Sequence, residues 1–266
     1  MKEFFEFLAF EWWGIAILVL FSIFLWLGLS ALFYRVFFKR FYDILLSGLA
    51  VIILSPLLLT LTILGALKMK GNPFFIQVRP GKIDKKTGEE KLFRLIKFRT
   101  MTCQKDENGK LLPDEKRLTK YGRILRSTSL DELPELINIF IGDMSLVGPR
   151  PQLVRDMVFM TKRQRERHRV RSGLTGLAQV AGRNNISWEQ KLDLDLQYIS
   201  RITFWKDLKI LLLTVYKVFK RSDIERDGTV SDIDFGDWLL SKGAVEKVEY
   251  EEKQKSAENI LQKYLM

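Results

Sequence analysis

The sequence predicts an α+β protein that is mostly helical, with a membrane-anchored domain and one small β-hairpin. Two long uncharged apolar runs lie near the N-terminus, at 12–34 and 44–67. Much of the chain beyond them carries helical periodicity. Only one pair of segments, 74–79 and 91–100, is enriched in β-forming residues and separated by a turn-rich stretch. Together these features indicate helices around a single hairpin.

Length and composition limit the classes of protein to which this chain can belong. A chain of 266 residues suits one domain plus membrane elements, and the net charge of +11 points to an anionic partner: a membrane surface, a nucleotide or a nucleic acid. Cys103 is the only cysteine, which excludes an internal disulfide. His168 is the only histidine, so a histidine-based catalytic triad and a multi-histidine metal site are also excluded. We expect both residues to be bystanders.

The first apolar run, 12–34, is 23 residues long, enough to cross a bilayer as a helix. Trp12 and Tyr34 mark its ends, as interfacial aromatic residues do. Glutamates dominate before the run, whereas basic residues including Arg35 and Arg40 follow it. The positive-inside rule therefore puts the N-terminus outside and the rest of the chain in the cytoplasm.

The second run, 44–67, has Ser55 and Pro56 at its middle. Proline removes one backbone hydrogen bond and bends a helix, and the Ser55 hydroxyl can satisfy the freed carbonyl. Positive charges flank the run on both sides, with Lys68 and Lys70 after it. A kinked transmembrane helix and a re-entrant helix that returns to the cytoplasmic face both fit these features.

In the predicted hairpin, Lys97 and Arg99 alternate with Phe98 and should share one strand face. A solvated face and an anion-binding face are both compatible with this pattern.

The densest group of charges lies between Tyr121 and Pro151. Its members include Arg123, Arg126, Asp131, Glu132, Asp143 and Arg150. With Asp131 as N-cap of a helix, Pro134 falls at N3, within the first turn, where proline is tolerated. Ser129 with Glu132 also fits a capping box with an earlier start. Both arrangements put two carboxylates at a helix N-terminus, and ordinary capping is an alternative to a functional role.

The same stretch predicts a buried helix face made of Leu133, Leu136, Ile137 and Phe140. Prolines on both sides of Arg150 stiffen its backbone, and guanidinium groups bind phosphate in a fork or stack on flat rings. Carboxylates among such cations suggest phosphoryl chemistry with a divalent metal.

A charged helix is predicted over 153–170. Its basic run requires nucleic-acid binding to be weighed, but no zinc knuckle, aromatic RNA-binding motif or helix-turn-helix spacing accompanies it. We predict a solvated face near anionic lipid instead, and no nucleic-acid partner. After it, Gly173, Gly176 and Gly182 predict a loop that brings backbone N–H groups and Arg171 near a substrate.

The last segments differ in charge. An amphipathic helix is predicted over 204–221, for which we favour contact with the membrane interface over the alternative of a core helix with a basic outer face. From Ser222 onward the chain carries 11 acidic and 6 basic residues, so the composition changes there. A helix is also predicted over 244–264.

Several motifs resemble one family. These are SLDELPELINIFIGDMSLVGPRP, the apolar FYDILLSGLAVIILSPLLL, IQVRPG, LIKFRTM, RSGLTGLAQVAGRNNISWEQK and DLKILLLTVYKVFKRS. Together they cover roughly Lys39 to Ser222 and resemble the bacterial sugar transferases, the monotopic phosphoglycosyl transferases, in particular the small type that transfers diacetylbacillosamine phosphate. Such enzymes move a sugar-1-phosphate from a nucleoside diphosphate sugar to polyprenol (undecaprenyl) phosphate, releasing UMP from a UDP-sugar.

The resemblance implies roles for the residues singled out above. Asp131 becomes the nucleophile that forms a phosphosugar-aspartyl intermediate, and Glu132 positions Mg²⁺ or assists proton transfer. Both carboxylates are therefore catalytic and metal-binding candidates. The substrate-binding candidates are Lys97, Arg99, Arg126, Asp143, Arg150 and Arg171.

The resemblance also implies an organisation and a location. It favours a re-entrant helix kinked at Ser55 and Pro56, at 39–70, followed by a cytoplasmic catalytic domain at 71–222. The resemblance does not cover the ends of the chain, where the first apolar run predicts a transmembrane helix at 1–38 and the change in composition predicts an acidic tail at 223–266. The catalytic domain would lie on the cytoplasmic face of the bacterial inner membrane, where exopolysaccharide or glycoconjugate assembly begins. A homodimer is left open. The alternatives are a non-enzymatic membrane-anchored binding protein and a two-pass protein with its domain outside.

Overall fold

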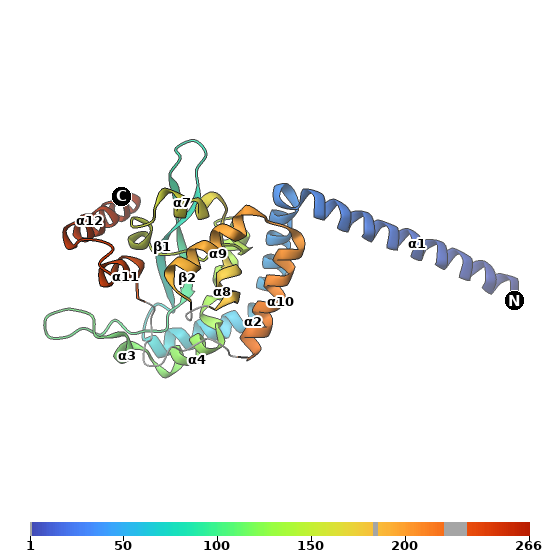
Figure 1. Cartoon of the computed structure of the whole chain (residues 1–266). Helices are drawn as coiled ribbons and strands as arrows, with labels where there is room; N and C mark the ends of the chain where they lie inside the picture. Colours follow the sequence, from blue (N-terminus) through green and yellow to red (C-terminus); the bar gives the residue numbers. More distant parts are fainter. Residues whose placement is uncertain (1, 183–185, 221–232) are drawn as a thin grey trace.

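The computed structural model describes residues 2–182, 186–220 and 233–266 and is mostly helical, with two small two-stranded sheets (Figure 1). This confirms the predicted combination of many helices with a small β-hairpin. The second sheet was not predicted.

A continuous apolar helical stretch, Trp12–Met69, is the one part of the described chain long and apolar enough to cross a membrane, and an 18-residue window within it has a mean hydropathy of 2.6. It comprises α1 (Lys2–Phe33), a π-helical turn (Tyr34–Phe38) and α2 (Lys39–Met69). In Figure 1, α1 projects away from the rest of the molecule, whereas α2 packs along it. The predicted long apolar N-terminal helix is confirmed.

The π-helical turn is fixed by a buried carboxylate of α10 (Phe204–Lys220). Asp207, which is 2% exposed, accepts hydrogen bonds from Tyr34 Oη (2.7 Å), Lys39 Nζ (2.6 Å) and Tyr198 Oη (2.8 Å). A π-turn has hydrogen bonds that span five residues, so it brings side chains five positions apart onto one side. Tyr34 and Lys39 therefore reach the same carboxylate.

Both ends of α2 contact the same globular body. Near its start, Arg40 Nη1 donates to Ile139 O (2.6 Å), and near its end Leu61 O accepts from Tyr121 Oη (2.9 Å). Pro56 lies inside the helix. The carbonyl that it leaves without a backbone donor, that of Ile52, accepts a hydrogen bond of 2.7 Å from Ser55 Oγ, as the sequence predicts.

The predicted hairpin is formed by β1 (Phe74–Ile83) and β2 (Glu90–Phe98), antiparallel strands with an irregularity between Pro80 and Ile83. Asn138 ties it to the helix that carries the charged stretch. Its Nδ2 donates to Arg94 O (2.8 Å) and its Oδ1 accepts from Ile96 N (3.1 Å). The asparagine side chain thus pairs with β2 much as another strand would.

The charged stretch begins with α3 (Asp114–Arg117) and α4 (Lys120–Thr128) and continues into a 3₁₀ turn (Leu130–Glu132) and α5 (Glu135–Ile141). Ser129 has a left-handed backbone, with φ of 56°, and ends α4. Pro134 is the N-cap of α5, so the predicted N-cap at Asp131 is wrong, whereas Ser129 is the N-cap residue of the 3₁₀ turn that carries both carboxylates. The Leu133–Pro134 turn separates the carboxylate pair from the helix that follows.

The predicted apolar face of this helix is divided between two environments. Leu136 is buried, together with the neighbouring Ile139. In contrast, Ile137 and Phe140 are 40% and 50% exposed, so the prediction that they are buried is wrong. The difference arises because one side of α5 packs in a core cluster with β2 and with partly buried residues of α2, whereas Ile137 and Phe140 lie outside that cluster.

The predicted charged helix over 153–170 is wrong: the chain forms α6 (Val154–Met157), α7 (Lys162–Arg165) and a 3₁₀ turn (Glu166–Arg169). Arg167 and His168 are each 1% exposed, so this segment is not simply a solvated face. Arg167 pairs with Asp195 at 2.6 Å, and His168 Nδ1 lies 3.0 Å from Glu90 Oε1. Internal ion pairing accounts for part of the basic run.

The remaining elements complete the body. Strand β3 (Met144–Val147) pairs in parallel with β4 (Ser172–Thr175), and α8 (Leu177–Ala181), α9 (Trp188–Ser200) and α10 follow. The apolar residues of α10 are divided between the core and the surface, because Ile210 is buried whereas Leu212 and Tyr216 are exposed.

Two C-terminal helices, α11 (Phe235–Ser241) and α12 (Lys247–Leu265), pack against α6 (Figure 1). The backbone N–H of Phe235 donates to Asp156 Oδ1 at 2.8 Å. The helix predicted over 244–264 is thus confirmed as α12. The start of the acidic tail, 223–232, lies outside the described residues.

Candidate functional site

The carboxylate pair occupies the 3₁₀ turn between α4 and α5, and two distant segments supply its cations. Glu132 Oε1 lies 2.8 Å from Lys97 Nζ, at the end of β2, and 2.8 Å from Arg150 Nη2, in the loop after β3. The side chains of Lys97 and Glu132 are 16% and 13% exposed, whereas that of Arg150 is 42% exposed. Glu132 therefore joins three segments of the chain at the edge of the body.

A third carboxyl belongs to the same cluster. Lys97 Nζ also lies 3.0 Å from Glu135 Oε1, and the Glu135 side chain is 3% exposed. The sequence analysis did not identify Glu135, although it follows Glu132 by three residues, a spacing that places helical side chains on one face. Lys97 therefore serves as the shared counter-ion of two glutamates.

The three carboxyls, those of Asp131, Glu132 and Glu135, differ in pKa because burial, mutual repulsion and the nearby cations act on them to different extents. Burial, followed by the charge of Glu132, raises the pKa of Asp131 to about 6, while Lys97, Arg126 and Arg150 oppose this rise. Burial alone would also raise the pKa of Glu132, but Arg150 and Lys97 outweigh it and hold that pKa well below its usual range. At neutral pH Glu132 is thus ionised and neutralised by its partners.

Glu135 has the opposite balance. Burial raises its pKa to about 7; Lys97 opposes the rise and the charge of Glu132 adds to it. Both glutamates act on Lys97. Burial lowers the pKa of Lys97, but the charges of Glu132 and Glu135 outweigh it and raise the pKa above its ordinary value. Lys97 is therefore charged throughout the neutral range. The site consequently has firmly charged groups beside two carboxyls that are close to their titration range.

Among the described residues, Asp131 makes no hydrogen bond or ion pair, although Lys97, Arg126 and Arg150 act on it electrostatically. Arg126 Nε is held by Thr100 Oγ1 at 3.1 Å. The carboxyl of Asp131 is therefore surrounded by cations that are engaged elsewhere.

Of the predicted site residues, the structure brings together Asp131, Glu132, Lys97, Arg126 and Arg150. The other three make different contacts. Arg99 donates to Met101 O (2.9 Å) and Cys103 Sγ (3.0 Å), so it does not share the surroundings of Lys97. Arg171 Nε donates to Gly142 O (2.7 Å), at the C-terminal end of α5. Asp143 lies near Asn138 Nδ2, at 3.5 Å.

The glycines predicted to present N–H groups to a substrate include two that serve close packing. A Cβ on Gly173 would lie 2.1 Å from Gly148 N, and one on Gly176 would lie 2.1 Å from Gly148 O. The N–H of Gly173 is already used, donating to Pro149 O at 2.9 Å. These glycines let β4 and its continuation approach the loop that carries Arg150.

The carboxylates of the charged cluster are potential ligands for a divalent cation. Mg²⁺ is commonly held by one or two carboxylates together with substrate phosphates, rather than by a full cage of protein ligands. Among the described residues no group of three or more potential ligand side chains is arranged around one point, but Asp131 and Glu132 are adjacent, and Asp131 has no protein partner. This donor set fits Mg²⁺ shared with a diphosphate.

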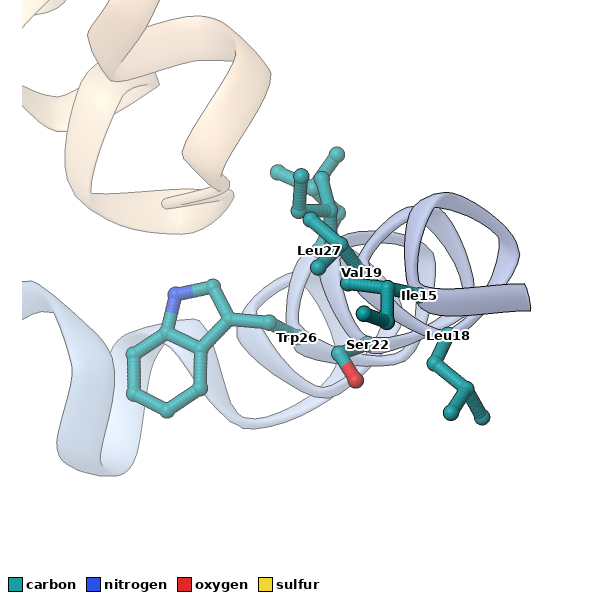
Figure 2. Close-up of a pocket in the computed structure, with 7 residues that line it drawn as sticks. Ile15, Leu18, Val19, Ser22, Trp26 and Leu27 are labelled. Carbon is teal, nitrogen blue, oxygen red and sulfur yellow. The ribbon is translucent and has the colours of Figure 1, made fainter. Parts of the chain in front are cut away.

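Two surface hollows lie away from these charges. Figure 2 shows one along α1, where Leu18, Val19, Trp26 and other apolar side chains surround the single hydroxyl of Ser22. The other lies beside α9 and includes Arg163 and Gln190 among other residues. The α1 hollow offers little to bind a phosphate, and its apolar lining suits hydrocarbon.

Comparison with known proteins identifies the class to which this arrangement belongs. The sequence model of the bacterial sugar transferase family matches residues 34–221, and the chain belongs to that family. This confirms the resemblance seen in the sequence motifs. The matched region includes α2, the hairpin and every residue of the charged cluster, but neither α11 nor α12.

Similarity to individual proteins extends over the same region. An uncharacterized sugar transferase EpsL of Bacillus subtilis is 46% identical over 193 residues, which cover 73% of this chain and 93% of EpsL. A UDP-glucose:undecaprenyl-phosphate glucose-1-phosphate transferase of Klebsiella pneumoniae is 39% identical over 192 residues, 68% of this chain and 40% of that protein. A protein with the same name from Caulobacter vibrioides is 38% identical over 187 residues, 66% of this chain and 68% of its own length.

Replacing Lys97 tests the electrostatics of the cluster. Lys97→Met removes the cation that Glu135 shares with Glu132, and loss of one partner from a buried ion pair is strongly destabilising. We expect the free energy of unfolding to fall by ~3 kcal/mol, the low end of the usual range, because Arg150 remains on Glu132. Thermal unfolding in detergent micelles measures the change.

The pH dependence of this loss has a definite sign. In the variant the pKa of Glu135 rises further above its unfolded value, so the folded state binds more protons and stability falls as pH rises. The deficit should therefore be larger at pH 8 than at pH 6, and the further change Glu135→Gln should reduce it. Lys85→Met, at an exposed lysine, is the control. An equal deficit at both pH values would contradict the assigned role of Glu135.

Proposed function

We propose that this protein transfers a sugar-1-phosphate from a UDP-sugar to undecaprenyl phosphate, releasing UMP and initiating exopolysaccharide or glycoconjugate assembly. The observation that carries the proposal is the carboxyl of Asp131, which has no hydrogen-bond or ion-pair partner among the described residues and is influenced by the charges of Lys97, Arg126 and Arg150. Family membership and the names of the relatives from Klebsiella and Caulobacter support the reaction class and make UDP-glucose the first donor to test.

The chemistry follows from the state of each carboxyl. Because the pKa of Asp131 is about 6, it is mostly ionised at neutral pH and able to act as a nucleophile. One Asp131 oxygen attacks the phosphorus attached to the sugar, the bond from that phosphorus to the bridging oxygen breaks, and UMP leaves with the electron pair. Undecaprenyl phosphate then attacks the phosphosugar-aspartyl intermediate and regenerates the carboxylate.

The cations have separate tasks in this scheme. Lys97 and Arg150 hold Glu132 ionised beside the reacting carboxylate and offer their remaining donors to phosphate oxygens. Arg126 lies close enough to Asp131 to stabilise charge on the transferred phosphoryl group. Asp131 and Glu132 would hold Mg²⁺, which supplies neutralisation of the diphosphate when bound.

A membrane position brings the soluble donor and the lipid acceptor together. We infer that α1 anchors the protein in the inner membrane, that α2 enters the bilayer and returns, and that the site faces the cytoplasm. The contacts of both ends of α2 with one globular body support this topology. The exposed apolar residues of α2, α5 and α10, such as Ile53, Phe140 and Leu212, support immersion of this side.

The nucleophile is tested by Asp131→Asn. The amide has nearly the shape of the carboxyl but cannot form the acyl phosphate, so turnover should be lost while the protein still inserts and folds. The measurement is UMP release from a panel of UDP-sugars with undecaprenyl phosphate in detergent, and Glu115→Gln, at an exposed glutamate, should keep full activity. More than a few per cent of residual activity in Asp131→Asn would exclude the covalent role. No UMP release by the parent protein with any UDP-sugar would overturn the proposed reaction.

The metal requirement gives a second test. Excess EDTA should stop UMP release, because the diphosphate would then lack its counter-charge, and added Mg²⁺ should restore the rate. EDTA already saturated with Mg²⁺ controls for effects of the chelator itself. Undiminished activity in free EDTA would contradict the assignment of Asp131 and Glu132 as metal ligands.

The topology is tested by cysteine labelling in a Cys103→Ser background. A cysteine at Lys70 should react only from the cytoplasmic side, and one at Lys2 only from the outside. Straightening α2 with Ser55→Ala and Pro56→Ala should make the Lys70 position partly reactive from outside, since the uncharged run is long enough to span. Outside labelling at Lys70 without these changes would show that the segment already crosses the membrane.

A further inference from the structure

The loop that carries Arg150 is held through its backbone by three separate parts of the chain. Prolines at 149 and 151 have no N–H, so this loop is rich in acceptors and poor in donors. Its three consecutive carbonyls are all satisfied. Pro149 O accepts from Gly173 N (2.9 Å), Arg150 O from Arg167 Nη2 (2.6 Å) and Pro151 O from Arg79 Nη1 (3.1 Å).

Two of these donors are guanidinium groups that are themselves anchored. Arg167 is 1% exposed and forms two hydrogen bonds with Asp195 Oδ2, at 2.9 and 2.6 Å. Arg79 Nη2 donates to Gln77 Oε1 at 2.6 Å. Arg79 is therefore held by Gln77 of its own strand and Arg167 by Asp195 of α9, and each guanidinium also donates to a carbonyl of the loop.

The surroundings of Arg79 disfavour its positive charge, because the side chain is buried and lies near the charge of Arg150. Burial, followed by the nearby charge of Arg150, lowers the pKa of Arg79 to about 10, so it remains charged at neutral pH despite both effects. Its Nε is buried without a hydrogen-bond partner among the described residues. The contact with Pro151 O is a charge-assisted hydrogen bond, stronger than one between neutral groups.

We propose that Arg79 and Arg167 are positioning residues for the reaction: by gripping the carbonyls of Pro151 and Arg150, they aim the Arg150 side chain at Glu132 and at the donor phosphate. This inference rests on the proposed function, in which Arg150 acts on the substrate. The backbone on both sides of the Arg150 Cα is held by hydrogen bonds, which fixes the direction in which its half-exposed side chain leaves the backbone. Errors of about 1 Å in such groups can reduce rates by roughly 100-fold.

The test separates positioning from general stabilisation. Arg79→Lys and Arg167→Lys keep the positive charge but lose the planar fork that bonds two partners at once. Each should lower kcat/KM for UMP release by about 10- to 100-fold. The same changes made in an Arg150→Ala background should lower it by less than about twofold, because residues that act through one group are not additive.

Arg155→Gln provides the matched control. Arg155 lies on α6, four residues after Pro151, and pairs with Asp234 rather than with the loop. Its loss should leave kcat/KM within about twofold of the parent in both backgrounds. Full additivity of Arg79→Lys or Arg167→Lys with Arg150→Ala would show a role independent of Arg150 and would overturn the proposal.

A second measurement does not depend on catalysis. Hydrogen–deuterium exchange of the peptide covering 148–153 should accelerate in Arg79→Lys and Arg167→Lys, but not in Arg155→Gln. If Arg167→Lys fails to fold because Asp195 loses its partner, Arg79→Lys alone decides the outcome. Unchanged exchange in a folded Arg79→Lys protein would overturn the proposal. If the parent protein released no UMP but exchange of the loop were still faster in Arg79→Lys, the proposed reaction would be refuted. The hydrogen bonds from Arg79 to the loop backbone would still be supported.

Discussion

The organisation of the candidate site depends on the ion pairs of Glu132. One oxygen of this carboxylate lies 2.8 Å from both Lys97 and Arg150, which belong to a strand and to a loop after a different strand. Burying a carboxylate is costly unless it is paired, so the charges hold these segments in one arrangement. The same pairing leaves the neighbouring Asp131 as the carboxyl without a partner among the described residues.

A second buried carboxylate, Asp207, holds the long apolar helix to the rest of the structure. Asp207 accepts from Tyr34, Lys39 and Tyr198, which fixes the turn between α1 and α2 to the helices of the globular body. The start of α2 is thereby attached to the body, and Tyr121 attaches its other end through Leu61 O. A long apolar helix attached at both ends has little freedom to leave the domain, so the apolar surface and the charged site keep a fixed relation.

Much of the fold was predictable because it depends on local patterns. Uncharged runs indicate the long apolar helix, alternation and turn residues indicate the hairpin, and the donor lost at Pro56 indicates the Ser55 hydrogen bond that is present. The failures occurred where tertiary contacts outweighed such patterns. The basic run near residue 165 was expected to be solvated, but Arg167 and His168 are buried because Asp195 and Glu90, distant in the sequence, pair with them.

The sequence by itself determined which residue types are available for the site and that the carboxylates at 131 and 132 are adjacent. It also determined family membership, since each motif is a continuous stretch of sequence that can be recognised without the structure. Only the tertiary structure decided that Arg150 reaches Glu132 while Arg171 caps the end of α5, because charge and spacing do not specify which distant segments meet. The role of Glu135 as a second partner of Lys97 was likewise decided by packing, since its burial depends on how α5 lies against β2.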